Sequence, residues 1–169
     1  MPYPLHPALV HLPLGLALTT PILAIGIALA AWRGFLPRRA WIAAVALQTL
    51  LLAGGVADLL AGEKESRRVE KVIGKDPVEE HEDRAEAFLW AAGAVLSVSA
   101  AALVVPAVAG GPLVALSLAG MIAVAVLAIR TGSAGGDLVY RYGAARAYGA
   151  GTAAGGEARE AEHGENGKR

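Results

Sequence analysis

The sequence predicts an all-α integral membrane protein, a four-helix bundle with antiparallel neighbours. Its 169 residues are 55% hydrophobic and 18% charged, and their mean hydropathy of +0.49 exceeds what an ordinary soluble domain shows. Four apolar stretches follow one another, without the period-2 alternation of a membrane β-barrel. Because backbone groups in lipid must satisfy their own hydrogen bonds, each stretch is expected to be a helix.

The expected spans cover about residues 8–32, 40–61, 87–109 and 113–131. A helix needs about 20 apolar residues to cross a hydrocarbon core of about 30 Å. The first three stretches reach that length, and the fourth borrows Arg130, whose long side chain can snorkel to the interface. No Lys or Arg precedes residue 32, so the first stretch is interpreted as a retained span rather than a signal peptide.

The connections predict two hairpins. Residues 33–39 and 110–112 are expected as tight turns on one membrane face, and the polar segment 63–86 lies with both termini on the other. A count of all Lys and Arg gives three on the turn side and twelve on the other, which would place the termini in the cytoplasm. However, the first span usually dominates, and its three flanking arginines all follow it, so we expect the termini outside. Residues 149–169 are rich in Gly, Ala and charge, which predicts a disordered tail.

The composition also limits the function. Fifteen acidic residues balance fifteen basic ones, which argues against a nucleic-acid partner. The absence of cysteine excludes disulfides, iron–sulfur clusters, zinc–thiolate sites and a cysteine nucleophile. Since no phosphate-binding, dinucleotide-binding or hydrolase motif stands in a suitable context, an enzyme is less expected than a binding or structural protein.

Ionisable residues gather near one membrane face, and they define the candidate site. Histidines at the start of the first span and before the third could supply the two axial ligands of a b-type haem, since one imidazole from each of two helices is a workable pair. We expect His11 and His81 as this pair, with His6 as a substitute and Arg130 near a haem propionate.

A divalent metal ion is the alternative ligand, because mixed nitrogen and oxygen donors suit Zn²⁺ and similar ions. The candidate metal ligands are His6, His11, His81, Asp58 and Glu63. Two simpler readings compete with both ligands. The histidines can cap helices or meet headgroups at the interface, and Asp58 can pair with Arg130. No catalytic residue is predicted.

Three segments together resemble one bacterial family: HPALVHLPLGL at the first span, EEHEDRAEAF before the third, and TGSAGGDLVYRYGAA after the fourth. They are similar to the domain-of-unknown-function 2231 family of membrane proteins, over about residues 4–145. The resemblance implies a four-helix protein of the bacterial inner membrane, and His6, His11 and His81 match the family's histidines. Some relatives carry cytochrome c or Rieske-type domains, which implies a link to electron transfer outside the cytoplasm. This chain has no CxxCH motif, and it has only Ser133 where many relatives carry another polar or aromatic residue.

Three functions therefore remain open from the sequence. The first is haem binding with electron transfer, the second is a divalent-metal-binding module, and the third is a structural or assembly subunit without its own chemistry. The expected partners are the lipid bilayer, subunits of a respiratory or other membrane complex, and further copies of the same chain. Small-residue helix faces, which allow close helix packing in lipid, are the feature that supports the third function.

Overall fold

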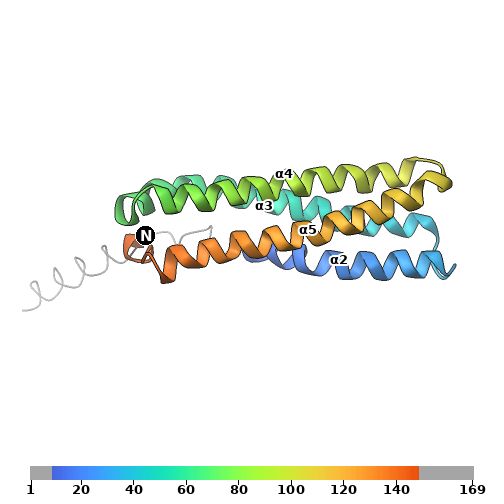
Figure 1. The fold of residues 1–169 in the computed structure, drawn as a ribbon, viewed down its shortest axis with the longest axis horizontal. Helices are drawn as coiled ribbons and strands as arrows, with labels where there is room; N and C mark the ends of the chain where they lie inside the picture. Colours follow the sequence, from blue (N-terminus) through green and yellow to red (C-terminus); the bar gives the residue numbers. More distant parts are fainter. Residues whose placement is uncertain (1–8, 149–169) are drawn as a thin grey trace, which may run out of the picture.

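The computed structural model describes residues 9–148, and four long helices make up most of them (Figure 1). In chain order these are α2 (His11–Trp32), α3 (Ile42–Ile73), α4 (Asp76–Val104) and α5 (Ala107–Tyr140), with a short 3₁₀ helix η1 (Arg38–Trp41) before α3. All four are long and apolar enough to cross a membrane. The expected all-α bundle with four spans is confirmed, whereas the predicted disordered tail lies outside the described residues.

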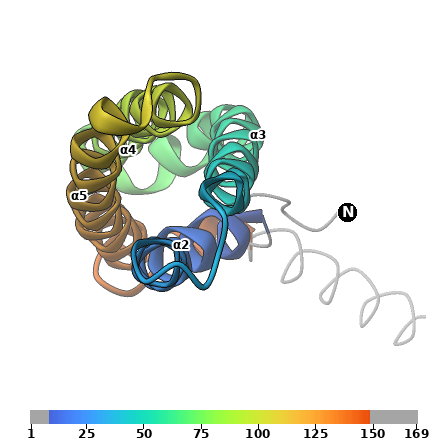
Figure 2. The ribbon, with the colours of Figure 1, turned by 90° about the vertical axis from the view of Figure 1, so that its right-hand side faces the viewer.

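The helices stand around a common axis in the order α2, α3, α4, α5, so that α2 and α5 close the ring (Figure 2). Each is antiparallel to the next along the chain. At about 1.5 Å per residue, α2 is about 33 Å long and just crosses a membrane, while α3 and α5 reach about 48 and 51 Å. The extra length of α3, α4 and α5 projects beyond α2 at one end (Figure 1).

This projecting part is called the polar end below, and it comprises residues 58–86 and 130–148. The opposite part, residues 29–42 and 102–112, is called the turn end. Segment 63–86, expected as a polar connection, is mostly helical: α3 continues to Ile73, Gly74 turns the chain at φ +89°, and α4 begins at Asp76. Pro77 in the first turn of α4 and the acidic residues there suit a helix N-terminus.

The first hairpin of the turn end follows the sequence expectation. After α2 ends at Trp32, Gly34 adopts φ +79°. The amide of Gly34 donates to Ala31 O and that of Phe35 donates to Ala30 O. This is a Schellman motif, in which a residue with positive φ ends the helix and satisfies its last carbonyls.

The second hairpin differs from the expectation. The chain turns at Val105 and Pro106, and Gly110, Gly111 and Pro112 lie within α5. The reason is the proline: it cannot continue α4, and it forces Val105 into an extended conformation with ψ 157°. Gly110 is buried in the helix because the guanidinium of Arg38 lies against it, at 2.7 Å from where a Cβ would be.

The bundle is held together by close packing of its helices at glycine residues and by a small layer of polar side chains. A Cβ on Gly55 or Gly120 would lie 2.6 Å from a side chain of α4, Leu89 or Val95 respectively, so both glycines permit tight packing. In the middle of the bundle Gln48 Nε2 donates to Ser99 Oγ at 2.9 Å, and Trp41 Nε1 donates to the Ser99 carbonyl at 3.2 Å. The exposed apolar side chains of all four helices face outward, where lipid would cover them.

Candidate functional site at the polar end

Two ionisable residues of the predicted site lie in the interior of the polar end. Asp58, on α3, is only 9% exposed, and His81, on α4, is half-buried. A carboxylate inside a membrane bundle is costly unless it is neutralised, hydrated or hydrogen-bonded, so such a residue marks a candidate site. Their helices are direct neighbours in the ring.

Glycine contacts give the relative depth of these groups. Gly55 faces Phe88 and Leu89 across the α3–α4 contact. Asp58 lies three residues from Gly55 and His81 seven residues from Phe88, both towards the polar end. At 1.5 Å per residue these offsets are about 4.5 and 10.5 Å, so the depths of Asp58 and His81 differ by about 6 Å.

The imidazole of His81 packs closely against α5. A Cβ on Gly135 would lie 3.1 Å from His81 Cε1, closer than an unstrained contact, whereas the adjacent Gly136 has nothing within 4 Å. Gly135 is therefore the surface against which the imidazole packs. Beside it, Thr131 Oγ1 donates to the Arg84 carbonyl at 3.1 Å and joins α5 to α4.

The other predicted ligands do not join Asp58 and His81 in the interior. His11, Glu63 and Arg130 are all exposed, although His11 is close in depth because the neighbouring Leu12 contacts Gly54. His6 lies outside the described residues. Among residues 9–148 there is no cluster of three or more His, Asp or Glu side chains that could hold a metal ion. The haem pair and the five-ligand metal set therefore stay predictions.

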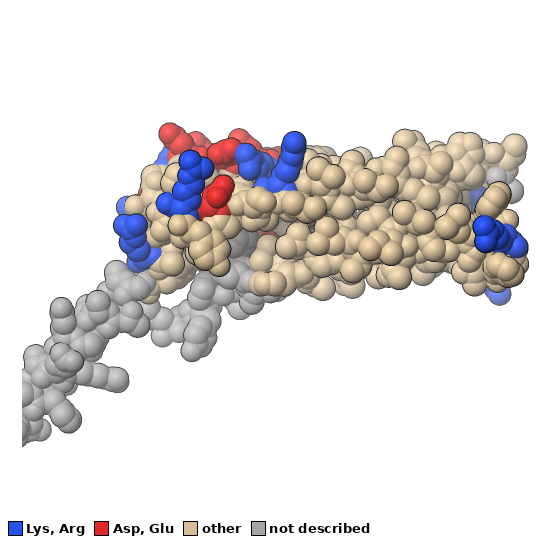
Figure 3. All heavy atoms as spheres, turned by 60° about the horizontal axis from the view of Figure 1, so that its bottom comes forward, with Lys and Arg blue, Asp and Glu red and all other residues tan. Residues whose placement is uncertain are grey.

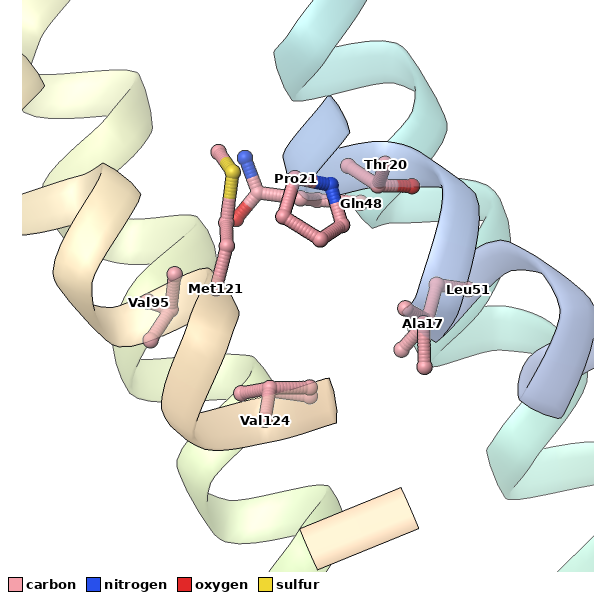
Figure 4. Close-up of a pocket in the computed structure, with 9 residues that line it drawn as sticks. Ala17, Thr20, Pro21, Gln48, Leu51, Val95, Met121 and Val124 are labelled. Carbon is pink, nitrogen blue, oxygen red and sulfur yellow. The ribbon is translucent and has the colours of Figure 1, made fainter. Parts of the chain in front are cut away.

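An apolar layer closes the interior below the site. It combines buried side chains from all four helices, namely Ala17, Leu51, Phe88, Ala92, Val124 and Ala128. Nearer the middle, Thr20, Pro21, Gln48 and Met121 line a narrow central space (Figure 4). The volume of this cavity is about 10 Å³, which is the lower limit for holding a single water molecule. This part of the interior is thus closely packed.

The polar end also carries an acidic groove on its outer side, which sequence reasoning missed. The groove measures about 620 Å³ and lies between α3 and α4, with leucines and Gly93 in its apolar part. Its polar and aromatic lining comprises Glu63, Glu82, Asp83, Glu86 and Trp90. Spacings of three and four residues put 82, 86, 89/90 and 93 on one face of α4, and this was the signal that could have revealed it. Two of its carboxylates are already engaged, since Ser66 donates to Glu82 and Trp90 donates to Glu86 at 3.2 Å.

The residues after α5 cover the tip of the α3–α4 hairpin. Val69, Val78 and Ala144 form a small buried cluster there. Tyr148 OH donates to Glu65 Oε2 at 2.7 Å, and the Arg68 guanidinium lies 5.9 Å from the Tyr148 ring centroid. Burial, reinforced by the hydrogen bond to Glu65, raises the pKa of Tyr148 to about 12. The segment 131–145 is helical to Tyr140 and turns only after it.

Charge is distributed unequally between the two ends. On the face drawn in Figure 3, acidic and basic side chains mix at the polar end, while only basic ones appear at the turn end. In the sequence no Asp or Glu occurs before Asp58 or between residues 87 and 136. The fold and this asymmetry define a polytopic helical membrane protein with one end of mixed charge and one basic end.

The comparison with protein families agrees with this class. The family described as "Predicted membrane protein (DUF2231)" matches residues 2–147. The chain therefore belongs to this family, which is the one that its three sequence segments resemble. No curated protein and no solved structure matches the chain.

Proposed function

We propose that the protein is a membrane-embedded module with an acid–base site at its polar end, built on Asp58 and His81. The observation that carries this proposal is a buried carboxylate on one helix and a half-buried imidazole on the neighbouring helix, with depths that differ by about 6 Å. A carboxylate and an imidazole are the groups that exchange protons in membrane proteins. Two such groups need no third ligand to accept and release a proton.

The site works from one side of the membrane. The apolar layer through Leu51 and Phe88 supports this, because a continuous proton path would need polar groups or water across it. The module would exchange protons, or bind a protonated ligand, on the side of the α3–α4 hairpin. It would not conduct protons through the bundle.

That side is proposed to face away from the cytoplasm in a bacterial inner membrane. The support is the turn end, where Arg33, Arg38 and Arg39 have no acidic neighbour in the sequence. Short connections rich in Arg favour the cytoplasm. At the polar end, basic residues are interleaved with carboxylates and pair with them, as Arg84 does with Glu80 at 2.5 Å and Lys75 with Glu79 at 2.6 Å.

A double-mutant cycle tests the acid–base site on the full-length protein in detergent. Asp58→Asn, His81→Gln and the double variant are compared by thermal unfolding at several pH values between about 5 and 8, where imidazole titrates. Coupled sites should give a non-additive stability that changes with pH. The matched control is Glu63→Gln with His11→Gln, which pairs an exposed carboxylate with an exposed imidazole. Additive, pH-independent effects at 58 and 81 would exclude the site.

Haem is a second candidate, favoured by the interior position of the His81 imidazole. On the α5 side the imidazole packs directly against Gly135, so a porphyrin would have to approach from the α2–α3 side. The test is an oxidised-minus-reduced visible spectrum of protein expressed with ample haem. A sharp reduced α-band that disappears in His81→Ala supports haem, and a flat spectrum at good yield rejects it. Elemental analysis of the same sample tests the divalent metal.

An assembly role alone is the remaining proposal, and small-residue contacts support it. If respiratory or other membrane subunits, or further copies of the chain, pack on the bundle, they must use its lipid-facing surface. A native pull-down from solubilised membranes tests this role. Recovery of the same partners with Asp58→Asn/His81→Gln would separate assembly from acid–base chemistry.

A further inference from the structure

The turn end has a concentration of positive charge that no acidic residue in the described part of the chain neutralises. Arg33, Arg38 and Arg39 stand within seven residues. Acidic residues are absent from the first 57 positions and from 87–136, so within residues 9–148 no carboxylate lies at this end. Figure 3 shows the blue side chains alone at this end of the bundle.

The three arginines are not equivalent. Arg38 is used by the fold: its Nη2 donates to the carbonyls of Ala102 and Val105, each at 2.5 Å, and so caps the C-terminus of α4. Arg33 and Arg39 are exposed and form no ion pair with any residue in the described range 9–148. Two guanidinium groups are therefore available to an external anion.

Aromatic side chains set the depth of these groups in the membrane. Trp32 is 79% exposed and Phe35 is 78% exposed, on either side of Arg33. Such rings settle at the boundary between hydrocarbon and headgroups. The Arg33 guanidinium lies 5.9 Å from the Trp32 ring centroid, and the Schellman turn at Gly34 fixes the connection. From these rings we expect the Arg33 guanidinium to lie near the level of the lipid phosphates, with Arg39 in the same short connection.

We propose that Arg33 and Arg39 form a binding site for the phosphate of an anionic phospholipid. A guanidinium group binds phosphate through two parallel hydrogen bonds. A zwitterionic headgroup carries its own cation, which already balances the phosphate charge, so an anionic lipid is the better partner for an arginine. The exposed Trp32 and Phe35 would contact the glycerol and upper acyl chains. A free phosphate ion offers the same charge without these apolar contacts. The site is independent of Asp58 and His81, which lie at the other end.

The test is lipid binding to the full-length protein in neutral detergent, followed by native mass spectrometry. Phosphatidylglycerol and phosphatidylcholine are titrated separately, and inorganic phosphate is added in excess as a competitor. The key variant is Arg33→Gln/Arg39→Gln. The matched control is Arg67→Gln/Arg141→Gln, which removes two exposed arginines from the polar end. Thermal unfolding in zwitterionic detergent verifies that both variants fold. If the key variant does not, Arg39→Gln alone replaces it.

We expect phosphatidylglycerol to bind more tightly than phosphatidylcholine. Each arginine near an anionic surface contributes about a fivefold factor, so the key variant should lose about 25-fold and Arg39→Gln alone about fivefold. The control should change less than twofold. An unchanged affinity in the key variant, or an equal loss in the control, overturns the site. Displacement of the lipid by inorganic phosphate also overturns it, in favour of a simple anion site.

Discussion

The guanidinium of Arg38 and the main chain of Gly110 are in direct contact: a Cβ at residue 110 would lie 2.7 Å from Nη2. The contact joins η1 to the first residues of α5, and the same guanidinium holds the last carbonyls of α4. One side chain therefore fastens three helices at the turn end. Its geometry depends on a glycine that the sequence suggested only as a turn.

Substitution of this glycine should loosen the turn end. Gly110→Ala should displace Arg38 and lower stability by about 1.5–3 kcal/mol, the value of a hydrogen bond made by a charged group. Gly111→Ala is the neighbouring control, since nothing lies within 4 Å of its position. It should be neutral or slightly stabilising, because alanine is the better helix former. Thermal unfolding in detergent compares them, and equal melting temperatures would show that Arg38 does not hold the end.

The buried polar layer should contribute modestly. Ser99→Ala removes the Oγ that Gln48 Nε2 contacts at 2.9 Å, and interhelical hydrogen bonds in membranes are worth about 0.6 kcal/mol and at most about 1.7. We expect a loss in this range. Ser97→Ala serves as control, because Ser97 is exposed and donates only to the Gly93 carbonyl of its own helix. Equal loss in both variants would contradict a role for the contact between helices.

The packing of His81 against α5 can be tested without replacing the histidine. Gly135→Ala places a Cβ 3.1 Å from His81 Cε1, while Gly136→Ala meets nothing within 4 Å. Imidazole ¹⁵N signals of histidine-labelled protein report the result, and His81→Gln identifies the resonance. We expect the His81 signals to move in Gly135→Ala and to stay in Gly136→Ala. Unmoved signals in both would mean that the imidazole does not pack on α5.

Alkaline pH should release the C-terminal cover. The pKa of Tyr148 is raised to about 12 by burial and by its hydrogen bond to Glu65, against about 10 in the unfolded chain. Since the folded pKa is the higher one, this stabilisation is complete below about pH 10 and disappears as the pH rises towards 12. Tyrosinate absorbance should lose its late-titrating component in Tyr148→Phe. Tyr140→Phe, at a 92% exposed position, should leave that component in place.

Orientation can be read from single cysteines, because the native chain has none. Lys75→Cys marks the hairpin of the polar end, and Gly111→Cys marks the turn end; both positions are exposed. In intact cells a membrane-impermeant maleimide should label residue 75, and residue 111 should react only after permeabilisation. The reverse pattern would place the polar end in the cytoplasm.

The sequence predicted the fold well because the length of an apolar stretch is a direct measure of a span. Each of the four predicted spans corresponds to a helix that is long and apolar enough to cross a membrane. The ends were harder. Glu63–Ile73 is polar but consists largely of good helix formers, so α3 continues beyond the membrane instead of ending with its apolar residues. The turn after α4 followed Pro106, whereas the two glycines at 110 and 111 are tolerated inside a helix.

The site was only half predictable. Asp58 and His81 stood out as ionisable residues at span ends, but which face of each helix turns inward depends on packing. In lipid both faces of a helix are apolar, so hydrophobic periodicity gives little information on rotation. The packing of His81 against Gly135 joins residues far apart in the chain, and no local pattern encodes it. The groove beside Trp90 left a partial signal, the spacing of its lining residues along α4, but the contribution of α3 depends on how the two helices pack.

The uneven charge along the bundle gives the molecule an electric dipole parallel to the membrane normal. In the proposed orientation its three arginines sit on the negative side of an energised membrane. To carry them to the positive side against a potential of about 100 mV would cost about 7 kcal/mol. The membrane voltage therefore acts on the hairpin between α2 and α3 while the chain inserts, and a de-energised membrane would select the topology less strictly.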